Sequence, residues 1–266
     1  MSTELLDLAR SIATRAAASA LEARRRGVSV AATKSSDVDI VTEVDRDTED
    51  LIRSLILDAR PNDGILGEEG EGVVGTSGVS WVVDPIDGTV NFLYGNPAWA
   101  VSVAVVEGEP EPASWRALAG VVAQPTTGTV FEASAGGGAR ADGRELQVNR
   151  DVPLSRALVG TGFGYRADVR AEQAAIVAAL LPQARDIRRI GSAALDLCAV
   201  AAGTLDAYYE RGLNPWDHAA GALIAAEAGA RVAGLHGAPA GHALTIAAAP
   251  ELFGPLEAAL LAAGIE

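Results

Sequence analysis

Acidic residues stand at several points in this chain where a secondary-structure element is expected to end or a helix to begin. They are Asp45, the neighbours Glu68 and Glu69, the pair Asp84 and Asp87, and Asp217. Each has a structural explanation when taken alone, because Asp-Pro and Asp-Gly are common in turns and aspartate caps helices. Asp84 and Asp87, however, follow an apolar run that predicts a strand, and α/β proteins bind ligands beyond the carboxyl ends of strands. These side chains are therefore candidates for one site.

Several carboxylates meeting at one place would need cations. Two bare carboxylates 4 Å apart repel by roughly 1 to 4 kcal/mol, depending on screening. Oxygen ligands favour Mg²⁺ or Mn²⁺ over zinc, and none of the three histidines is paired with another at a metal-ligand spacing. Two such ions about 3.5–4 Å apart activate a water, hold phosphoryl oxygens and stabilise a leaving alkoxide. The pattern predicts a divalent-metal site for phosphate chemistry, provided that Glu68 and Asp217 reach Asp84 and Asp87.

The segment Asp87-Gly88-Thr89 adds groups that suit a phosphate. Gly88 lets the backbone approach a ligand closely, and N–H groups at the start of the following helix bind anions. The Thr89 hydroxyl is placed to orient a water. Asn91 and Phe92 are expected to pack the start of that helix rather than to take part in chemistry.

Alternating strands and helices must position these residues. Apolar periodicity predicts helices at 4–25, 44–60, 168–181, 192–203 and 217–229, and strands at 81–83, 98–107, 120–123, 129–133, 157–161, 205–209 and 243–248. Residues 61–79 are rich in glycine and acids, which predicts a loop. Because the expected strands and helices do not alternate strictly along the chain, a layered α/β or α+β fold is expected. The chain shows no repeat or linker, which predicts one domain over 1–266.

Composition narrows the function. The 266 residues are 49 % hydrophobic, enough for a large core, and carry a formal net charge of −14. Such a charge disfavours binding to nucleic acid or to an anionic membrane, and no basic cluster suited to a second phosphate is apparent. The single cysteine, Cys198, rules out an internal disulfide and is expected to be a small buried hydrophobe. No leader or membrane-length apolar run is apparent, so a cytoplasmic location is expected.

Two motifs resemble those of the inositol monophosphatase family. They are Trp81-Val82-Val83-Asp84-Pro85-Ile86-Asp87-Gly88-Thr89-Val90-Asn91-Phe92 and Trp216-Asp217-His218-Ala219-Ala220-Gly221. Further matches are Lys34-Ser35-Ser36 with Asp39-Ile40-Val41-Thr42, Gly67-Glu68-Glu69, Arg189-Ile190-Gly191-Ser192-Ala193-Ala194 and Asp206-Ala207-Tyr208-Tyr209-Glu210. The resemblance spans nearly the whole chain in the same order, and among family members it is strongest to the bacterial inositol-1-monophosphatases.

The resemblance implies a role for each matching residue. Glu68, Asp84 and the Ile86 carbonyl would bind a first Mg²⁺, and Asp84, Asp87 and Asp217 a second. A third, weaker ion would lie near Glu68 and Glu69, with Mn²⁺ as a possible substitute and Lys34 close by. Thr89, hydrogen-bonded to Asp45, would help to activate the attacking water. The residues that would contact the substrate are Asp87, Gly88, Thr89, Ala193, Glu210 and Asp217.

The family resemblance also implies a layered αβαβα sandwich of the inositol monophosphatase and fructose-1,6-bisphosphatase type, a homodimer and inhibition by lithium. The expected reaction is hydrolysis of a small phosphorylated polyol, with myo-inositol 1-phosphate as the leading substrate. Alternatives are fructose 1,6-bisphosphate, histidinol phosphate and 3′-phosphoadenosine 5′-phosphate. Asn214-Pro215 stands where family members vary, which leaves the alcohol half of the substrate open.

Two other interpretations carry less weight. Some bacterial relatives act as partners of the transcription or RNA-processing machinery, but the intact acidic set favours an enzyme. The run Gly160-Thr161-Gly162-Phe163-Gly164 resembles a nucleotide-binding loop. A lone glycine pattern is a weak signal outside a βαβ unit, so this run is interpreted as a loop at the border of the substrate site.

Overall fold

Helices α1 (Ser2–Arg26) and α2 (Glu43–Ala59) form the first layer of a computed structural model that describes residues 2–27, 30–33 and 40–266. Alanines at 9, 13 and 16 are fully buried on α1, and their small side chains let the helix lie close to the sheet beneath it. Ile52 and Ile56 complete the buried face from α2. Both helices were expected from the apolar periodicity, and both are confirmed.

The second layer is a seven-stranded sheet in the order β3-β4-β5-β6-β7-β8-β9. Its strands are β3 (Gly64–Gly67), β4 (Val79–Asp87), β5 (Ala100–Glu107), β6 (Arg116–Gln124), β7 (Thr129–Ser134), β8 (Ala139–Ala141) and β9 (Arg144–Glu145). Only β3 and β4 are parallel within it, and the other neighbours are antiparallel. Successive strand residues face opposite sides: Trp81 and Val83 pack toward α1 and α2, whereas Val82 packs toward the interior.

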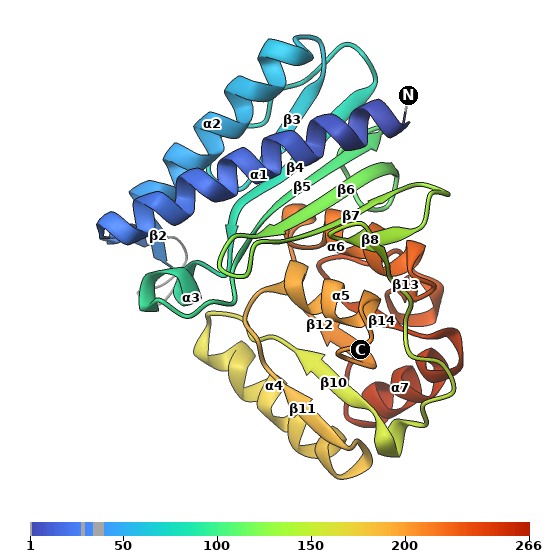
Figure 1. The fold of residues 1–266 in the computed structure, drawn as a ribbon. Helices are drawn as coiled ribbons and strands as arrows, with labels where there is room; N and C mark the ends of the chain where they lie inside the picture. Colours follow the sequence, from blue (N-terminus) through green and yellow to red (C-terminus); the bar gives the residue numbers. More distant parts are fainter. Residues whose placement is uncertain (1, 28–29, 34–39) are drawn as a thin grey trace.

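A five-stranded sheet forms the fourth layer, in the order β11-β10-β12-β14-β13. Its strands are β10 (Leu158–Thr161), β11 (Asp186–Arg188), β12 (Ala207–Glu210), β13 (Arg231–Ala233) and β14 (Thr245–Ala248). The helices α5 (Ala193–Ala201) and α6 (Pro215–Glu227) lie between the two sheets (Figure 1). Helices α4 (Ala167–Leu180) and α7 (Pro250–Ala262) cover the outer face. The predicted αβαβα sandwich is confirmed.

Shorter elements connect these layers. The strands β1 (Val30–Thr33) and β2 (Ile40–Thr42) form an antiparallel pair, α3 (Thr89–Tyr94) follows β4, and three 3₁₀ turns are η1 (Leu154–Arg156), η2 (Leu181–Gln183) and η3 (Leu235–Gly237). Among the described residues, no helix is both long enough and apolar enough to cross a membrane.

Several expectations about local structure were wrong. The segment 61–79 contains β3, which the glycine-rich composition concealed, and the sequence pattern missed β11, β13 and α7. The strand expected to end at Asp84 continues to Asp87, because a shift in its pairing with β5 accommodates the residues between them. Cys198 is fully buried, as expected, and burial raises its pKa well above the usual value.

Candidate active site

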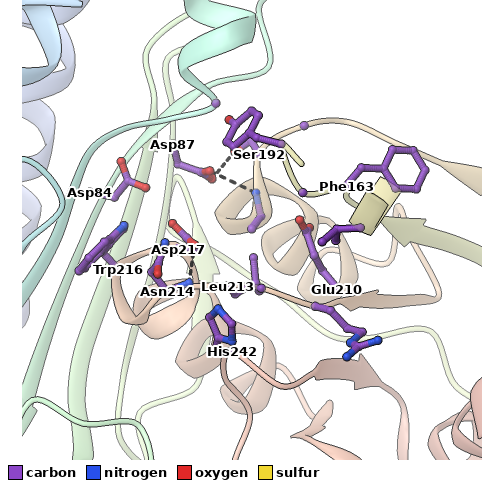
Figure 2. Close-up of a pocket in the computed structure, with 18 of the residues that line it drawn as sticks. Asp84, Asp87, Phe163, Ser192, Glu210, Leu213, Asn214, Trp216, Asp217 and His242 are labelled. Carbon is purple, nitrogen blue, oxygen red and sulfur yellow. Dashed lines mark hydrogen bonds between the residues drawn. The ribbon is translucent and has the colours of Figure 1, made fainter. Parts of the chain in front are cut away.

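A pocket of about 660 Å³ opens between the two sheets, beyond the end of β4 and beside the N-termini of α5 and α6. The four carboxylates singled out by spacing all line it: Glu68, Asp84, Asp87 and Asp217. They come from segments up to 149 residues apart in the chain, and Figure 2 shows Asp84, Asp87 and Asp217 around the same space. Carboxylates from distant parts of the chain thus line one pocket.

The turn after β4 can be made only by glycine. Gly88 has a φ of +96°, and a Cβ at this position would lie 3.0 Å from the carbonyl oxygens of Ala98 and Gly191. Asn91 stabilises the same turn, because its side-chain nitrogen donates to the carbonyl oxygens of Ala98 and Ile190 at 2.6 and 3.0 Å. Asn91 therefore packs the start of α3, as expected from the sequence.

The other end of α3 is tied to α1. The Arg24 guanidinium donates from Nε to the Phe92 carbonyl oxygen at 2.6 Å and lies 5.9 Å from the centre of the Phe92 ring. A cation at this place also complements the partial negative charge of the helix C-terminus. Arg24 lies in the last turn of α1, and its side chain also fixes the helix that begins at Thr89.

Asp87 is bound to the N-terminus of α5. Its carboxylate accepts a hydrogen bond from the Ser192 hydroxyl at 2.5 Å (Figure 2) and another from the backbone N–H of Ala194 at 2.8 Å. Burial raises the pKa of Asp87, and these hydrogen bonds, which favour the charged form, oppose that shift. The side chain is therefore fixed in orientation by the N-terminus of α5.

Asp217 combines a structural and a candidate functional role. It is the third residue of α6, and its carboxylate accepts the backbone N–H of Asn214 at 2.6 Å in a capping box. Burial raises the pKa of Asp217 well above its usual value, and repulsion from Glu68 and Asp87 raises it further. The N-cap of α6 is therefore Asn214 and not Asp217, which completes the capping box from the third position and also belongs to the acidic pocket.

Glu49, which the sequence did not indicate, holds the loop that carries Glu68. The buried Glu49 carboxylate accepts the backbone N–H groups of Glu69 and Gly70 at 2.8 and 2.9 Å and pairs with Arg53 at 2.7 Å. A Cβ at position 67 would fall within 2.6 Å of the Glu49 carboxylate, so glycine is needed there. This anchor orders the chain on both sides of Glu68.

Thr89 and Asp45 lie in contact, as the family resemblance predicted. The Thr89 hydroxyl oxygen lies 3.1 Å from Asp45 Oδ1 and 3.1 Å from the Ile86 carbonyl oxygen. The buried Asp45 also accepts the backbone N–H of Thr42 at 2.9 Å. Burial raises the pKa of Asp45, and the hydrogen bonds from Thr42 and Thr89 oppose that rise. A hydroxyl that donates to such a carboxylate can accept a hydrogen bond from a water in the pocket.

The donor types suggest a metal site, but the side chains that the structure describes are not arranged closely enough to bind an ion. Within 2–27, 30–33 and 40–266, no three His, Cys, Asp or Glu side chains stand close enough together to hold an ion. Asp87 and Asp217 are instead turned toward backbone N–H groups. The donors still fit a hard cation, because the lining carboxylates and the Ile86 carbonyl offer only oxygen. A cation would also relieve the repulsion recorded in the raised pKa of Asp217.

The side of the pocket formed by the end of β12 carries Glu210, which the family resemblance singled out. Ala193, also singled out, lies against the carboxylates, because its backbone N–H donates to Asp87 at 3.3 Å. The Tyr208 hydroxyl donates to Glu210 Oε2 at 2.5 Å, and burial raises the pKa of Glu210 to about 7. A Cβ on Gly162 would lie 2.0 Å from the same carboxylate, so the loop after β10 needs glycine there. Phe163 and Asn214 border this side, as expected, and Lys34 lies outside the described residues.

One expectation about the pocket is wrong. The sequence showed no basic cluster, yet Arg166, Arg189 and Arg211 all line the pocket. They are about 22 residues apart in the chain and come together only because β10, β11 and β12 are neighbours in one sheet. Their spacing gave no signal that could have identified them.

The chain was compared with known proteins. The inositol monophosphatase family profile matches residues 1–264. A curated relative, the inositol-1-monophosphatase SuhB of Mycobacterium tuberculosis, is 52 % identical over 238 residues, which cover 85 % of this chain and 80 % of that protein. A relative from Xylella fastidiosa named Nus factor SuhB is 44 % identical over 209 residues, covering 78 % and 73 %.

The fold was compared in the same way. A solved structure of Mycobacterium tuberculosis SuhB superimposes with a TM-score of 0.84 at 45 % identity and covers 100 % of this chain and 98 % of its own. The similarity therefore extends over both sheets and all of the helices that surround the pocket.

Proposed function

Because this chain belongs to the inositol monophosphatase family and is a phosphatase, we propose that it hydrolyses myo-inositol 1-phosphate to inositol and phosphate with Mg²⁺. The observation that carries this proposal is the convergence of four distant carboxylates on one pocket beside the Gly88-Thr89 turn. A protein with a net charge of −14 needs cations between itself and an anionic substrate, and this pocket offers the oxygen ligands for them.

The proposed metal ligands follow from the donors that line the pocket. Glu68, Asp84 and the Ile86 carbonyl would hold one Mg²⁺, and Asp84, Asp87 and Asp217 a second. A third, weaker ion is proposed near Glu68 and Glu69, and Mn²⁺ is a candidate substitute. When bound, such ions supply charge neutralisation at the phosphoryl group and a lowered pKa for the attacking water.

The chain's own residues would orient the reacting groups. The Thr89 hydroxyl donates to Asp45 and accepts a hydrogen bond from the attacking water, which directs the water's lone pair toward phosphorus. The backbone N–H groups of Gly88 and Thr89 are proposed to hold phosphate oxygens. A bond forms between the water oxygen and phosphorus while the bond from phosphorus to the inositol oxygen breaks. The water gives up a proton and the inositol oxygen takes one up, so that inositol and phosphate leave, and no phosphorylated side chain is involved.

The alcohol half of the substrate is assigned to the other side of the pocket. Glu210 and the region of Ala193, together with Asp87, are proposed to bind inositol hydroxyls, and Asp217 borders the same space. Glu210 is suited to this because the Tyr208 hydroxyl occupies one of its oxygens and fixes its orientation. Fructose 1,6-bisphosphate, histidinol phosphate and 3′-phosphoadenosine 5′-phosphate remain alternative substrates.

Other properties are proposed from family membership. They are one domain over residues 1–266, assembly as a homodimer, inhibition by lithium and a cytoplasmic location. The relative named Nus factor SuhB supports a second candidate role, as a partner of the transcription machinery. Direct contact with nucleic acid is disfavoured by the net charge of −14.

Release of phosphate from the candidate substrates, with and without Mg²⁺, tests the proposal. We expect Mg²⁺-dependent release that is fastest with myo-inositol 1-phosphate. Preference for another of the four substrates would overturn the substrate assignment but retain the phosphatase. A protein that releases phosphate from none of them, yet co-purifies with RNA polymerase, would favour the partner role.

A further inference from the structure

Glu210 lines two cavities, the active-site pocket and a second, much smaller one. In the pocket, the carboxylate side consists of Glu68, Asp84, Asp87 and Asp217, and the arginine side, which also carries Glu210, of Arg166, Arg189 and Arg211. The small cavity lies at the ends of β10 and β12, against α4, and offers about 10 Å³ to the centre of a water molecule. One ordered water needs roughly 10–15 Å³ of such space. The cavity therefore fits a single water and is too small for a phosphate or a polyol.

The Tyr209 hydroxyl is a buried donor on a residue that lines the small cavity. Tyr209 is 4 % exposed, and its hydroxyl has no hydrogen-bond partner in the part of the chain that the structure describes. Burial raises the pKa of Tyr209 and the nearby Thr161 hydroxyl lowers it, but the two hydroxyls do not meet at the distance and angle of a hydrogen bond. A buried hydroxyl without a partner destabilises the folded protein. A polar group that the chain itself does not supply is therefore expected beside it.

Gln173 on α4 supplies a second donor. Its Oε1 accepts the backbone N–H of Gly164 at 2.9 Å, and because a backbone N–H can only donate, this bond fixes which end of the amide is the oxygen. The other end, Nε2, donates to no residue that the structure describes. Gln173 is 7 % exposed and lines both the small cavity and the active-site pocket. Its Nε2 is thus held in direction while its hydrogens remain available.

Glu210 offers the matching acceptor. Its Oε2 accepts the Tyr208 hydroxyl at 2.5 Å, and its carboxylate accepts no other hydrogen bond from the described residues. The carboxylate fills the space in which a Cβ on Gly162 would lie, so it reaches the loop after β10 and the small cavity beside that loop. Figure 2 shows Glu210 next to this loop, which carries Phe163. A carboxylate can accept about four hydrogen bonds, so Glu210 has room for a further donor.

We propose that the small cavity binds one ordered water, which accepts from the Tyr209 hydroxyl and Gln173 Nε2 and donates to Glu210, so that Tyr209 and Gln173 position Glu210 for the alcohol half of the substrate. Three hydrogen bonds are the typical number for a buried water. The Gln173 amide also holds Gly164, so one side chain orients both Glu210 and the loop at the border of the substrate site. The positioning role rests on the proposed function, because it assumes that Glu210 binds inositol hydroxyls, whereas the water site does not.

A crystal structure of the full-length protein, at a resolution that shows ordered waters, tests the site directly. We expect one water within hydrogen-bond distance of the Tyr209 hydroxyl, Gln173 Nε2 and the Glu210 carboxylate. Arg211 also lines the small cavity, so its guanidinium is the competing donor to Glu210. A cavity that holds no water, or one that the Arg211 guanidinium fills, would overturn the proposal.

Tyr209→Phe removes only the hydroxyl and tests the positioning role. For myo-inositol 1-phosphate, kcat/KM should fall by roughly 5-fold, as for loss of one hydrogen bond, through a higher KM with little change in kcat. Glycerol phosphate has fewer hydroxyls for Glu210 to bind, so its hydrolysis should be unaffected, whereas a merely structural role would change both substrates alike. Tyr94→Phe is the matched control, because Tyr94 is exposed on α3 and lines neither cavity. An unchanged ranking of the two substrates in Tyr209→Phe would overturn the positioning role.

A double variant tests whether Tyr209 and Gln173 act through the same water. Gln173→Met keeps the length of the side chain but loses both the donor and the acceptor of Gly164, so kcat/KM for inositol phosphate should fall at least as much as in Tyr209→Phe. If both residues bind one water, adding Tyr209→Phe to Gln173→Met should cost less than about 2-fold more. A further loss of roughly 5-fold in the double variant would show that the two residues act independently, which would overturn the shared water.

The outcomes separate the water-mediated positioning of Glu210 from the proposed function. If the enzyme hydrolyses inositol phosphate but Tyr209→Phe leaves its substrate ranking unchanged, the positioning role fails and the proposed function stands. If the enzyme releases no phosphate from myo-inositol 1-phosphate, the proposed function fails instead. In that case the crystal structure still decides whether the small cavity binds a water.

Discussion

The two sides of the pocket are held in place by different means. On the carboxylate side, Asp84, Asp87 and Asp217 are anchored by backbone N–H groups of their own turns or of neighbouring helices. Beside the ends of β11 and β12, the side chains of Arg189 and Arg211 make no hydrogen bond to another residue that the structure describes, and Arg189 lies 5.9 Å from the centre of the Phe163 ring. The carboxylates are thus held by the main chain, whereas the two arginines are not.

This contrast has a physical reason. A buried carboxylate loses favourable hydration, and hydrogen bonds from the main chain compensate without adding a mobile partner. Reacting groups also gain from fixed geometry, since a displacement of about 1 Å can cost 100-fold in rate. An exposed guanidinium keeps its hydration and its rotamer freedom until a ligand binds. The contrast predicts that changes on the carboxylate side affect all substrates, and changes on the opposite side affect their ranking.

Asp84→Asn should have the largest effect. The substitution removes one negative charge from a side chain proposed as a ligand of both ions, and turnover should fall by more than the roughly 10–100-fold typical of groups behind the ligands. Phosphate release with every substrate provides the measurement, with the exposed Asp47→Asn on α2 as the control. Near-normal activity would show that Asp84 is not a shared ligand.

Thr89→Val should have the next largest effect. Valine keeps the shape of the side chain but loses the hydroxyl that contacts Asp45, so kcat should fall by roughly 100-fold or more, as for loss of a proton-transfer group. Thr89→Ser restores the hydroxyl and should recover most of kcat. If the serine variant is as slow as the valine variant, the hydroxyl is not the group that matters.

Glu49→Gln tests whether the anchoring of the Glu68 loop by Glu49 affects the binding of Mg²⁺. Glutamine loses the charge that pairs with Arg53 and one of the two oxygens that accept from Glu69 and Gly70. We expect a loss of roughly 10-fold in Mg²⁺ affinity, as is typical of groups behind metal ligands. Stability should fall as well, because the half-buried Arg53 loses its charged partner. The measurement is the Mg²⁺ dependence of kcat, with the adjacent exposed Asp50→Asn as the control. Unchanged Mg²⁺ dependence would show that the Glu68 loop is held by other contacts.

Glu210→Gln should have the smallest effect and a different character. Because the residue is not one of the proposed metal ligands, metal affinity should be retained, while kcat/KM for inositol phosphate should fall several-fold relative to glycerol phosphate. A change of this size is what loss of one hydrogen bond of roughly 1 kcal/mol produces. An equal decrease for both substrates would show that Glu210 does not determine specificity.

The sequence predicted the carboxylate side better than the arginine side. The three-residue spacing of Asp84 and Asp87 after an apolar strand is a local pattern, and so is the position of Asp217 at a helix start. Arg189 and Arg211 belong to separate strands, and only the order of the five-stranded sheet brings them to one pocket. The role of Glu49 could not be predicted from the sequence for the same reason, because its partners lie about 20 residues further along the chain.

The missed elements of the fold have similar causes. Strand β3 lies in a glycine-rich segment, where composition favours a loop, but parallel pairing with β4 overrides that preference. Helix α7 contains Pro255, which in isolation predicts a helix stop. Its apolar side chains nevertheless pack against the outer face of the second sheet, and Leu256 and Leu260 are fully buried. In both places tertiary packing outweighs local propensity.

Metal removal tests the central claim most directly, namely that the converging carboxylates act through bound divalent cations. Phosphate release from myo-inositol 1-phosphate is measured after chelation and again after Mg²⁺ is added back, while calorimetry follows binding of the ion to the metal-free protein. We predict that release stops on chelation and returns with Mg²⁺, and that Asp84→Asn weakens binding of the ion. Sustained release from the chelated enzyme would contradict the claim.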